Sequence, residues 1–369
     1  MQREELAAWL RLALTAQIGG ATARRLLAAF GLPQGIFEQP DAALGELLTA
    51  SQLRELRAYP SALEAQIERT LVWLSEAPER RRVCTLGDPD YPPALLQIED
   101  PPLLLYRLGR PLNEARTALA MVGSRNPTAQ GLQNARQFAQ ALAAQGLTIV
   151  SGLALGIDGA AHEGALDGAP ADAFATIAVV GTGLDRVYPA RHRELAHRIA
   201  ERGALVSEYP IGTPPLQQNF PRRNRLISGL SQGTLVVEAA VKSGSLITAR
   251  LAAEQGKEVF AVPGSIHSPQ ARGCHALLRE GAKLAESAQD VLEELRLAPA
   301  SPRVVADEAE EGEEDPLLAA MGYDPVGLDA LIARTGIPAP KLQATLLELE
   351  LAGHVARLPG GLFQRLASA

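Results

Sequence analysis

Cysteine, aromatic residues and long apolar runs are all scarce in this sequence. The two cysteines, Cys84 and Cys274, lie far apart and neither belongs to a C-x-x-C pair, so we predict neither a zinc site nor a disulfide framework. Aromatic residues are 4% of the chain, which excludes a long platform for stacking nucleic-acid bases. No apolar run approaches the roughly 18 residues that span a bilayer. Because the chain also begins with a charged amphipathic segment instead of a signal peptide, we expect a cytoplasmic protein.

Negative charge is confined to one stretch. The 369 residues have a formal net charge of −7, and residues 307–315 alone carry seven carboxylates and no base. The remainder of the chain is therefore neutral overall, so the acidic balance does not exclude an anionic ligand. Such a run buries too little apolar surface to offset the entropy of ordering, and we predict an acidic flexible linker over residues 298–315.

Hydrophobic periodicity divides the other residues into three parts. Residues 1–80 place apolar side chains three and four positions apart, which predicts an all-α domain. Residues 81–297 alternate short β-branched runs, glycine turns and helical segments. This alternation predicts an α/β fold with a doubly wound, mostly parallel, extended Rossmann-like sheet. Residues 316–369 show three helical segments and a glycine-turned hairpin, which is the pattern of a winged helix.

The two flanking parts have little excess of positive charge. Residues 17–31 resemble a helix-hairpin-helix, but residues 1–80 hold eight basic against ten acidic side chains. A helical packing module is therefore favoured over DNA contact there. The winged helix has four basic and four acidic residues, which favours contact with protein or weak contact with DNA.

Phosphate-suited residues follow the predicted strands of the central part. In a doubly wound sheet, the loops after the carboxyl ends of strands form the ligand crevice. Two such loops combine glycine, hydroxyls and a cation: Gly123, Ser124 and Arg125 in one, and Lys242, Ser243, Gly244 and Ser245 in the other. Glycine allows close approach of the backbone, and a helix start offers free N–H groups to an anion.

A third candidate wall is the stretch NFPRRNRLISGLS, residues 219–231. It places Arg222, Arg223 and Arg225 at an expected helix start, with Asn224 able to bridge a phosphate and a base edge. Phe220 is a stacking candidate, although core packing is the favoured role for it. Together with the two loops, the cluster favours binding of a nucleic-acid backbone with little sequence preference.

An exposed basic run also has an ordinary interpretation. The arginines of this stretch are equally compatible with a solvated helix face that meets carboxylates such as Glu208 or Glu238. We expect Arg225 to pack inward and order the pocket, because an apolar helix follows it directly. Arg222 and Arg223 are then expected to face the bound strand.

Seven ordered segments resemble the bacterial DNA-processing protein A family, also called DprA or Smf. They are MVGSRNPTAQG, SGLALGIDGAAHEGAL, GTGLDRVYP, SEYPIGTPP, NFPRRNRLISGLS, VVEAAVKSGSLITARLAAEQGKEVFAVPG and LLREGA. The resemblance implies a non-enzymatic, cofactor-free protein that binds and protects incoming single-stranded DNA in natural transformation and DNA recombination. It also implies loading of a RecA-type recombinase, a homodimer, and a sterile-alpha-motif-like domain at residues 1–80. The surface of the dimer is not indicated by the residues.

Enzymatic alternatives rest on partial motifs. Lys242 and Ser243 lack the glycines of a P-loop, and GTGLDR has two of the three glycines of a dinucleotide site. The segment SGLSQGTLVVEA resembles the signature of lysine-decarboxylase-like phosphoribohydrolases, in which Glu238 would be the counterpart of the catalytic glutamate. Ser231 and Gln232 replace the glycines that hold the nucleotide phosphate there, so hydrolase activity is disfavoured.

Three further polar residues are assigned no catalytic or binding role. Asp158 and His162 share one helix face, but no third ligand or nucleophile lies at metal-site spacing. We expect a carboxylate at a helix start with a hydrogen-bonded histidine beneath it. His275 stands where the resembled family usually carries asparagine, and we do not place it in the site.

Overall fold

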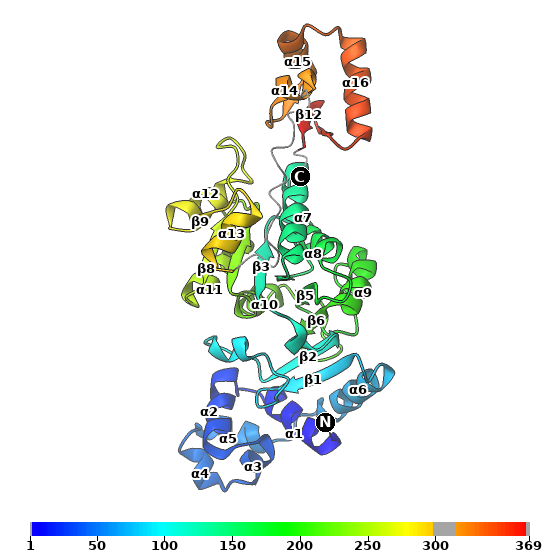
Figure 1. Cartoon of the computed structure of the whole chain (residues 1–369). Helices are drawn as coiled ribbons and strands as arrows, with labels where there is room; N and C mark the ends of the chain where they lie inside the picture. The colour runs from blue at the N-terminus through cyan, green and yellow to red at the C-terminus, as the bar shows by residue number, and fades with distance from the viewer. Residues whose placement is uncertain (1, 298–314, 367–369) are drawn as a thin grey trace.

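The computed structural model describes residues 2–297 and 315–366, so the predicted linker lies outside the described residues except for Asp315. A nine-stranded sheet forms the central part (Figure 1). Its strands are β1 (Arg81–Thr85), β2 (Leu104–Gly109), β3 (Ala118–Val122), β4 (Thr148–Ser151), β5 (Thr176–Val179), β6 (Ala204–Ser207), β7 (Gly233–Val236), β8 (Glu258–Ala261) and β9 (Lys283–Leu284).

The strands lie in the order β1-β2-β6-β5-β4-β3-β7-β8-β9. The pairs β1–β2 and β2–β6 are antiparallel, whereas every pair from β6 to β9 is parallel. The predicted mostly parallel, doubly wound α/β fold is confirmed. The order reverses at β3, which has β4 on one side and β7 on the other. The carboxyl ends of β3 and β7 therefore border the crevice in which such sheets bind ligands.

Helices cover both faces of the sheet, because successive parallel strands are joined by crossover helices. One layer contains α7 (Ala129–Ala144), α8 (Ile157–Gly168), α9 (Arg193–Arg202) and α13 (Ala288–Glu294), and the other contains α10 (Asn219–Gly229), α11 (Ser245–Glu254) and α12 (Arg272–Arg279). In β3, Leu119 and Met121 pack with the first layer, and Ala120 and Val122 pack with the second. Burial on both faces explains why this strand is apolar throughout.

The N-terminal part is helical, as predicted. Its helices are α1 (Arg3–Leu14), α2 (Gly20–Phe30), α3 (Pro33–Glu38), α4 (Asp41–Gly45), α5 (Ala50–Arg57) and α6 (Leu63–Glu76). Leu26, Ile36 and Leu44 belong to a core of its own. Trp9 of α1 and Trp73 of α6 instead join the core that continues into the sheet. These helices are therefore packed onto the edge of the sheet that β1 and β2 form.

The C-terminal part is a small α/β unit. It contains α14 (Pro316–Met321), β10 (Val326–Gly327), α15 (Leu328–Thr335), α16 (Ala339–Leu351), β11 (Val355–Leu358) and β12 (Leu362–Arg365). The three strands form an antiparallel sheet, and the apolar residues enclose a separate core. This is the predicted arrangement of three helices and a hairpin. Among the described residues, no helix has the length and apolarity needed to cross a membrane.

Candidate nucleic-acid interface

A cavity of about 700 Å³ opens at the point where the strand order reverses. Its wall includes the loop after β3, the segment between β7 and α11, and one face of α10. We call it the switch-point pocket. Of the sequence-predicted site residues, it brings together Gly123, Ser124, Arg125, Phe220, Arg223, Asn224, Lys242, Ser243, Gly244 and Ser245. Arg222 and Arg225 do not line it.

The loop after β3 is fixed by backbone contacts on both sides. The Ser124 N–H donates to the Glu238 carbonyl at 2.7 Å, and the Ser124 carbonyl accepts from Ile157 N–H at 3.1 Å. The Ser124 hydroxyl accepts from Asn126 N–H at 3.1 Å. Arg125 at the tip is exposed, and it has no ion-pair partner among the described residues. The fold thus presents its guanidinium to the pocket without neutralising it.

The second loop opens α11, as predicted. The hydroxyls of Ser243 and Ser245 lie 2.7 Å apart, and Ser245 N–H donates to the Ser243 hydroxyl at 3.4 Å. Lys242 is exposed and has neither an ion pair nor a hydrogen bond within the part of the chain that the structure describes. An added Cβ at Gly244 would meet no atom within 4 Å, so the backbone there is open to a ligand. Two unpaired cations therefore stand on opposite sides of the strand-order reversal.

The position of Arg223 differs from the expectation that this side chain faces a bound nucleic acid. Its side chain is buried, at 4% exposure, and its guanidinium donates to the carbonyls of Gly152 and Val179. An added Cβ at Gly152 would collide with this guanidinium, so a larger residue there would have to displace it. Burial lowers the pKa of Arg223 to about 10, and nearby Asp158 acts in the opposite direction. Arg223 therefore links the carboxyl ends of β4 and β5. Contrary to expectation, it does not offer a free guanidinium to a bound nucleic acid.

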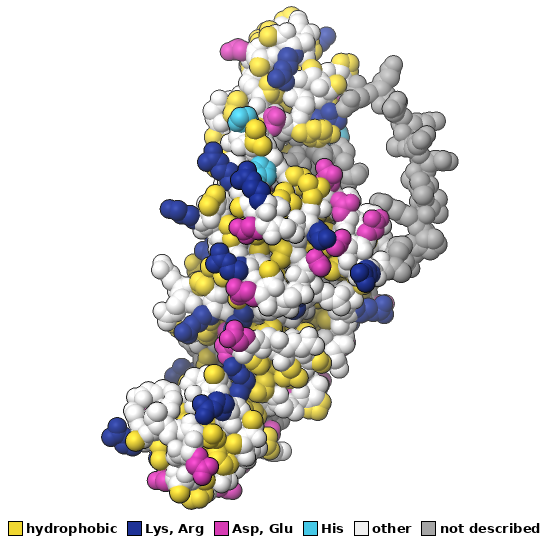
Figure 2. Space-filling model, turned by 90° about the vertical axis from the view of Figure 1, so that its left-hand side faces the viewer, with side chains coloured by type: hydrophobic (Ala, Val, Ile, Leu, Met, Phe, Trp, Pro, Cys, Tyr) yellow, Lys and Arg dark blue, Asp and Glu magenta, His cyan; other side chains and the backbone are white. Residues whose placement is uncertain are grey.

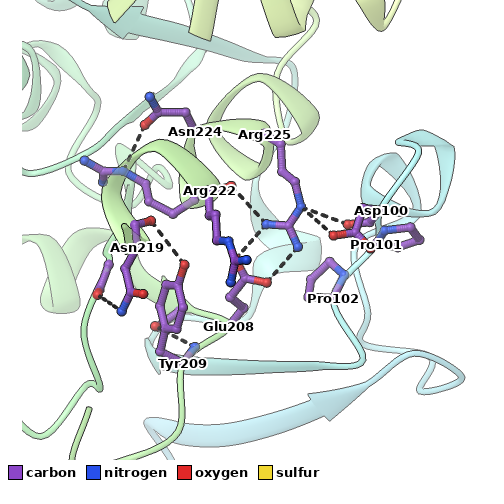
Figure 3. Close-up of polar contacts among 12 residues, drawn as sticks. Asp100, Pro101, Pro102, Glu208, Tyr209, Asn219, Arg222, Asn224 and Arg225 are labelled. Atoms are coloured by element: carbon purple, nitrogen blue, oxygen red, sulfur yellow. Dashed lines mark hydrogen bonds and ion pairs between the residues drawn. The ribbon is translucent and has the colours of Figure 1, made fainter. Parts of the chain in front are cut away.

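Arg225 packs inward as predicted, but it points to Glu208 and Asp100 (Figure 3) and does not line the pocket. Its guanidinium donates to both carboxylate oxygens of Glu208, at 2.6 and 2.7 Å, and to the Asp100 carbonyl at 3.0 Å. Asp100 also pairs with Arg24 of α2 at 2.6 Å. These contacts hold α10 against the segments around Asp100 and Glu208, and the expected role of Arg225 in ordering the pocket stays a prediction. Arg222 is exposed outside the pocket wall.

Aromatic side chains form one edge of the pocket. The rings of Phe220 and Tyr188 have centroids 5.6 Å apart at an interplanar angle of 34°. The Arg125 guanidinium lies 5.7 Å from the centroid of Phe220. Tyr188, at 49% exposure, was missed in the sequence-based prediction. Its only sequence signal is its place before Pro189, in a loop that follows a predicted buried strand, and this signal is not periodic.

Asp158 and His162 have the structural roles expected for them. Asp158 accepts from the N–H groups of Gly152 and Ala154, and the His162 ring nitrogen Nδ1 lies 2.7 Å from the Thr176 hydroxyl oxygen. Burial raises the pKa of Asp158 and lowers that of His162 to about 3. Within the described residues, no group of three or more histidine, cysteine or acidic residues is placed to hold a metal.

Glu238 is occupied in fixing the start of α7. Its carboxylate accepts from Thr128 N–H at 2.9 Å and from the Thr128 hydroxyl at 2.6 Å. An added Cβ at Gly131 would lie 2.4 Å from this carboxylate, so α7 approaches it closely. A carboxylate at a helix N-terminus is electrostatically stabilised. Glu238 does not line the switch-point pocket, and the arginines of α10 do not pair with it.

Side chains of both charges are interspersed on one face of the molecule. Figure 2 shows lysine and arginine side chains recurring along the face that it displays, with aspartates and glutamates among them. The mixture of charges on this face agrees with the neutral sum of the residues outside the acidic stretch. Among the described residues that line the pocket, Arg125 and Lys242 are the exposed cations without an ion-pair partner.

A model of the family described as DNA recombination-mediator protein A matches residues 82–296, which is more than half of the chain. The chain belongs to this family. A model of the DprA winged helix domain matches residues 299–361. The resemblance stated from the sequence motifs is thereby confirmed, as is the winged helix at the C-terminal end.

Other members of the family resemble long stretches of the chain. Protein Smf from Escherichia coli is 44% identical over 85% of this chain and 84% of its own length. DNA processing protein DprA from Bacillus subtilis is 44% identical over 57% of this chain and 70% of its own length.

Two solved structures share the fold of this family member. The X-ray structure of DNA processing protein A from Streptococcus pneumoniae has a TM-score of 0.62 at 36% identity, and covers 77% of this chain and 95% of that one. The protein from Helicobacter pylori, solved for insight into its single-stranded DNA binding mode, has a TM-score of 0.52 at 33% identity. This match covers 58% of this chain and 96% of that one.

Proposed function

We propose that this recombination mediator binds single-stranded DNA in the switch-point pocket. The observation that carries the proposal is the placement of two unpaired cations, Arg125 and Lys242, on loops that flank the strand-order reversal. Adjacent phosphates are held between these cations, with the Ser243 and Ser245 hydroxyls and the first N–H groups of α11 as further donors. The relative from H. pylori, whose structure concerns single-stranded DNA binding, supports this assignment.

Bases have a restricted role in this proposal. Tyr188 and Phe220 offer one aromatic edge, which is enough to stack one unpaired base but not a run of them. Affinity then comes mainly from the phosphates, with little preference for base sequence and a strong dependence on salt. Gly123 and Asn224 shape the pocket wall beside these contacts.

We further propose that the chain acts by binding and not by catalysis. The residue with a catalytic counterpart in a related fold, Glu238, is already engaged by Thr128. Membership in a recombination-mediator family supports a role in protecting incoming DNA and in helping to load a RecA-type recombinase. We propose that this occurs in the cytoplasm and as a homodimer, with residues 1–80, 81–297 and 316–369 as its domains.

Fluorescence anisotropy of labelled oligo-dT at several salt concentrations tests the proposal. We expect a log-log salt slope of about −2 to −4, which corresponds to roughly three to five phosphates on a single strand. Arg125→Ala and Lys242→Ala should each weaken binding by about tenfold or more. Arg250→Ala, which removes an exposed arginine of α11 outside the pocket, is the matched control and should bind as the wild type does.

Competition experiments distinguish a binding site for single-stranded DNA from a binding site for a nucleotide. Duplex DNA and mononucleotides should displace the labelled strand poorly, because neither presents several adjacent single-strand phosphates to the pocket. Easy displacement by a mononucleotide would refute the strand proposal, and release of free base from nucleoside monophosphates would show hydrolysis. In that case Glu238→Gln should abolish the release.

A further inference from the structure

A second cavity, of about 980 Å³, lies between α6 and α9. We call it the α6–α9 groove. The loop that joins β5 to α9 separates it from the switch-point pocket: Val187 lines the groove, and its neighbour Tyr188 lines the pocket. The Cα atoms of consecutive residues are about 3.8 Å apart. Consecutive residues of one loop therefore line the pocket and the groove.

The groove has more cationic side chains than its carboxylates neutralise. Each acidic residue of its wall already pairs with an arginine: Glu68 with Arg3, Glu76 with Arg81, and Asp185 with Arg186. Arg69 of α6 and Arg193 of α9 line the groove and are exposed. Neither has an ion-pair partner among the residues that the structure describes, so both are available to an anion. His197, one turn after Arg193, lines the same wall.

We infer that the α6–α9 groove is a second contact for single-stranded DNA, which takes phosphates of the strand that the switch-point pocket holds. This inference rests on the proposed function of the pocket and extends the strand's path onto the N-terminal helices. Arg69 and Arg193 supply the charge from opposite walls of the groove. The N-terminal helices then take part in binding even though residues 1–80 have no net positive charge, because the groove uses one arginine from each side.

The pairing of the acidic residues favours a polyanion over other ligands. An uncharged ligand gains nothing from Arg69 and Arg193, and a cation meets carboxylates that are already neutralised. A phosphodiester strand anchored in the neighbouring pocket also reaches the groove at a high effective concentration, so weak contacts there add to its affinity. This predicts that the groove contributes only when the strand is long enough to span both sites.

A length series tests the inference with the full chain. The probes are oligo-dT strands from about 4 to about 16 nucleotides, and the variant is Arg69→Ala with Arg193→Ala. Long strands should bind about tenfold more weakly to the double variant, with a salt slope reduced by about 1.4 for two lost phosphate contacts. The shortest strands, held by the pocket alone, should bind equally to both proteins. Arg198→Ala is the control, since Arg198 lies on α9 outside the groove and pairs with Asp167.

Trp73 supplies a second readout at the groove itself. It lines the groove at 4% exposure, and Trp9 is the other of the two tryptophans. In a Trp9→Phe background, long strands should change the emission of Trp73 and the shortest strands should leave it unchanged. Loss of long-strand affinity in the double variant together with a Trp73 response establishes the path.

The two proposals fail in different ways. If the wild type binds no strand of any length, the proposed function of the pocket is wrong. If the wild type binds and Arg125→Ala weakens it, but the double variant binds every length as the wild type does, the groove is not on the strand's path. That second result would overturn the inference. An unchanged unfolding midpoint of the double variant verifies that its fold is intact.

Discussion

The arginines of α10 and the cations of the two strand-end loops lie at the same edge of the sheet, but the fold uses them differently. On α10, Arg223 is buried against backbone carbonyls and Arg225 pairs with Glu208. In the loops, Arg125 and Lys242 remain exposed and unpaired within the described residues. The denser cluster in sequence thus offers less free charge to a ligand than two isolated cations do.

The difference follows from the position of each residue on its element. A helix packed on a sheet directs part of its circumference inward, so consecutive arginines on α10 necessarily point to different environments. A loop at the carboxyl end of a strand is directed into the crevice and has fewer neighbours that could pair with it. Availability of charge, and not its density along the sequence, is therefore the basis on which we propose Arg125 and Lys242 as anion-binding residues.

The largest effect, a loss of stability, is expected from substitution of Arg223. Arg223→Met keeps a long apolar side chain but removes the guanidinium, which leaves the Gly152 and Val179 carbonyls without their donor and Asp158 without its neighbouring cation. We expect the free energy of unfolding to fall by about 3 to 5 kcal/mol. Urea unfolding measures this loss. A midpoint equal to that of the wild type would show that the buried arginine is dispensable and would weaken the contrast with the loops.

A smaller effect on stability is expected at Arg225 and Glu208. The two side chains form a half-buried bidentate pair, so their single and double alanine variants should show a coupling energy of about 1 to 2 kcal/mol. Strand affinity should change little, because neither residue lines the pocket. The double-mutant cycle is measured by urea unfolding. If strand affinity falls more than stability does, Arg225 contacts the strand directly.

The loop cations should affect binding without affecting stability. Arg125→Lys keeps the charge but loses the planar fork and its place over Phe220. We expect this variant to bind single-stranded DNA about 1 kcal/mol more weakly, as measured by anisotropy. Its midpoint of urea unfolding should equal that of the wild type. Equal affinity of the lysine variant would mean that Arg125 acts as a simple point charge.

The smallest effect on stability and on DNA binding is expected from substitution of Arg222, the exposed arginine of α10. Arg222→Ala should alter the free energy of unfolding by less than about 0.5 kcal/mol. Since Arg222 lies outside the pocket wall, the salt slope of strand binding should change by no more than about 0.7, the contribution of one phosphate. Titrations at several salt concentrations measure the slope. A larger change would place Arg222 on the strand's path.

Much of the fold was predictable from the sequence. The apolar strands that precede glycine turns, and the helical segments between them, predict a parallel sheet covered by helices, because strands that are apolar throughout are buried on both faces. The loops at residues 123–125 and 242–245 were predictable as well, since a strand end followed by a helix start defines their position. Tyr188 was missed because a single tyrosine in a loop has no periodic pattern.

The sequence by itself determined which elements form, where the strand-end loops fall and which residues they carry, because these properties depend on local periodicity and turn chemistry. The tertiary structure decided which of the cations are free. Arg223 meets carbonyls that follow β4 and end β5, and Arg225 meets a carboxylate that follows β6. These partners come from distant parts of the chain. Only the packing of α10 on the sheet brings them within hydrogen-bond distance, so no local pattern reports them.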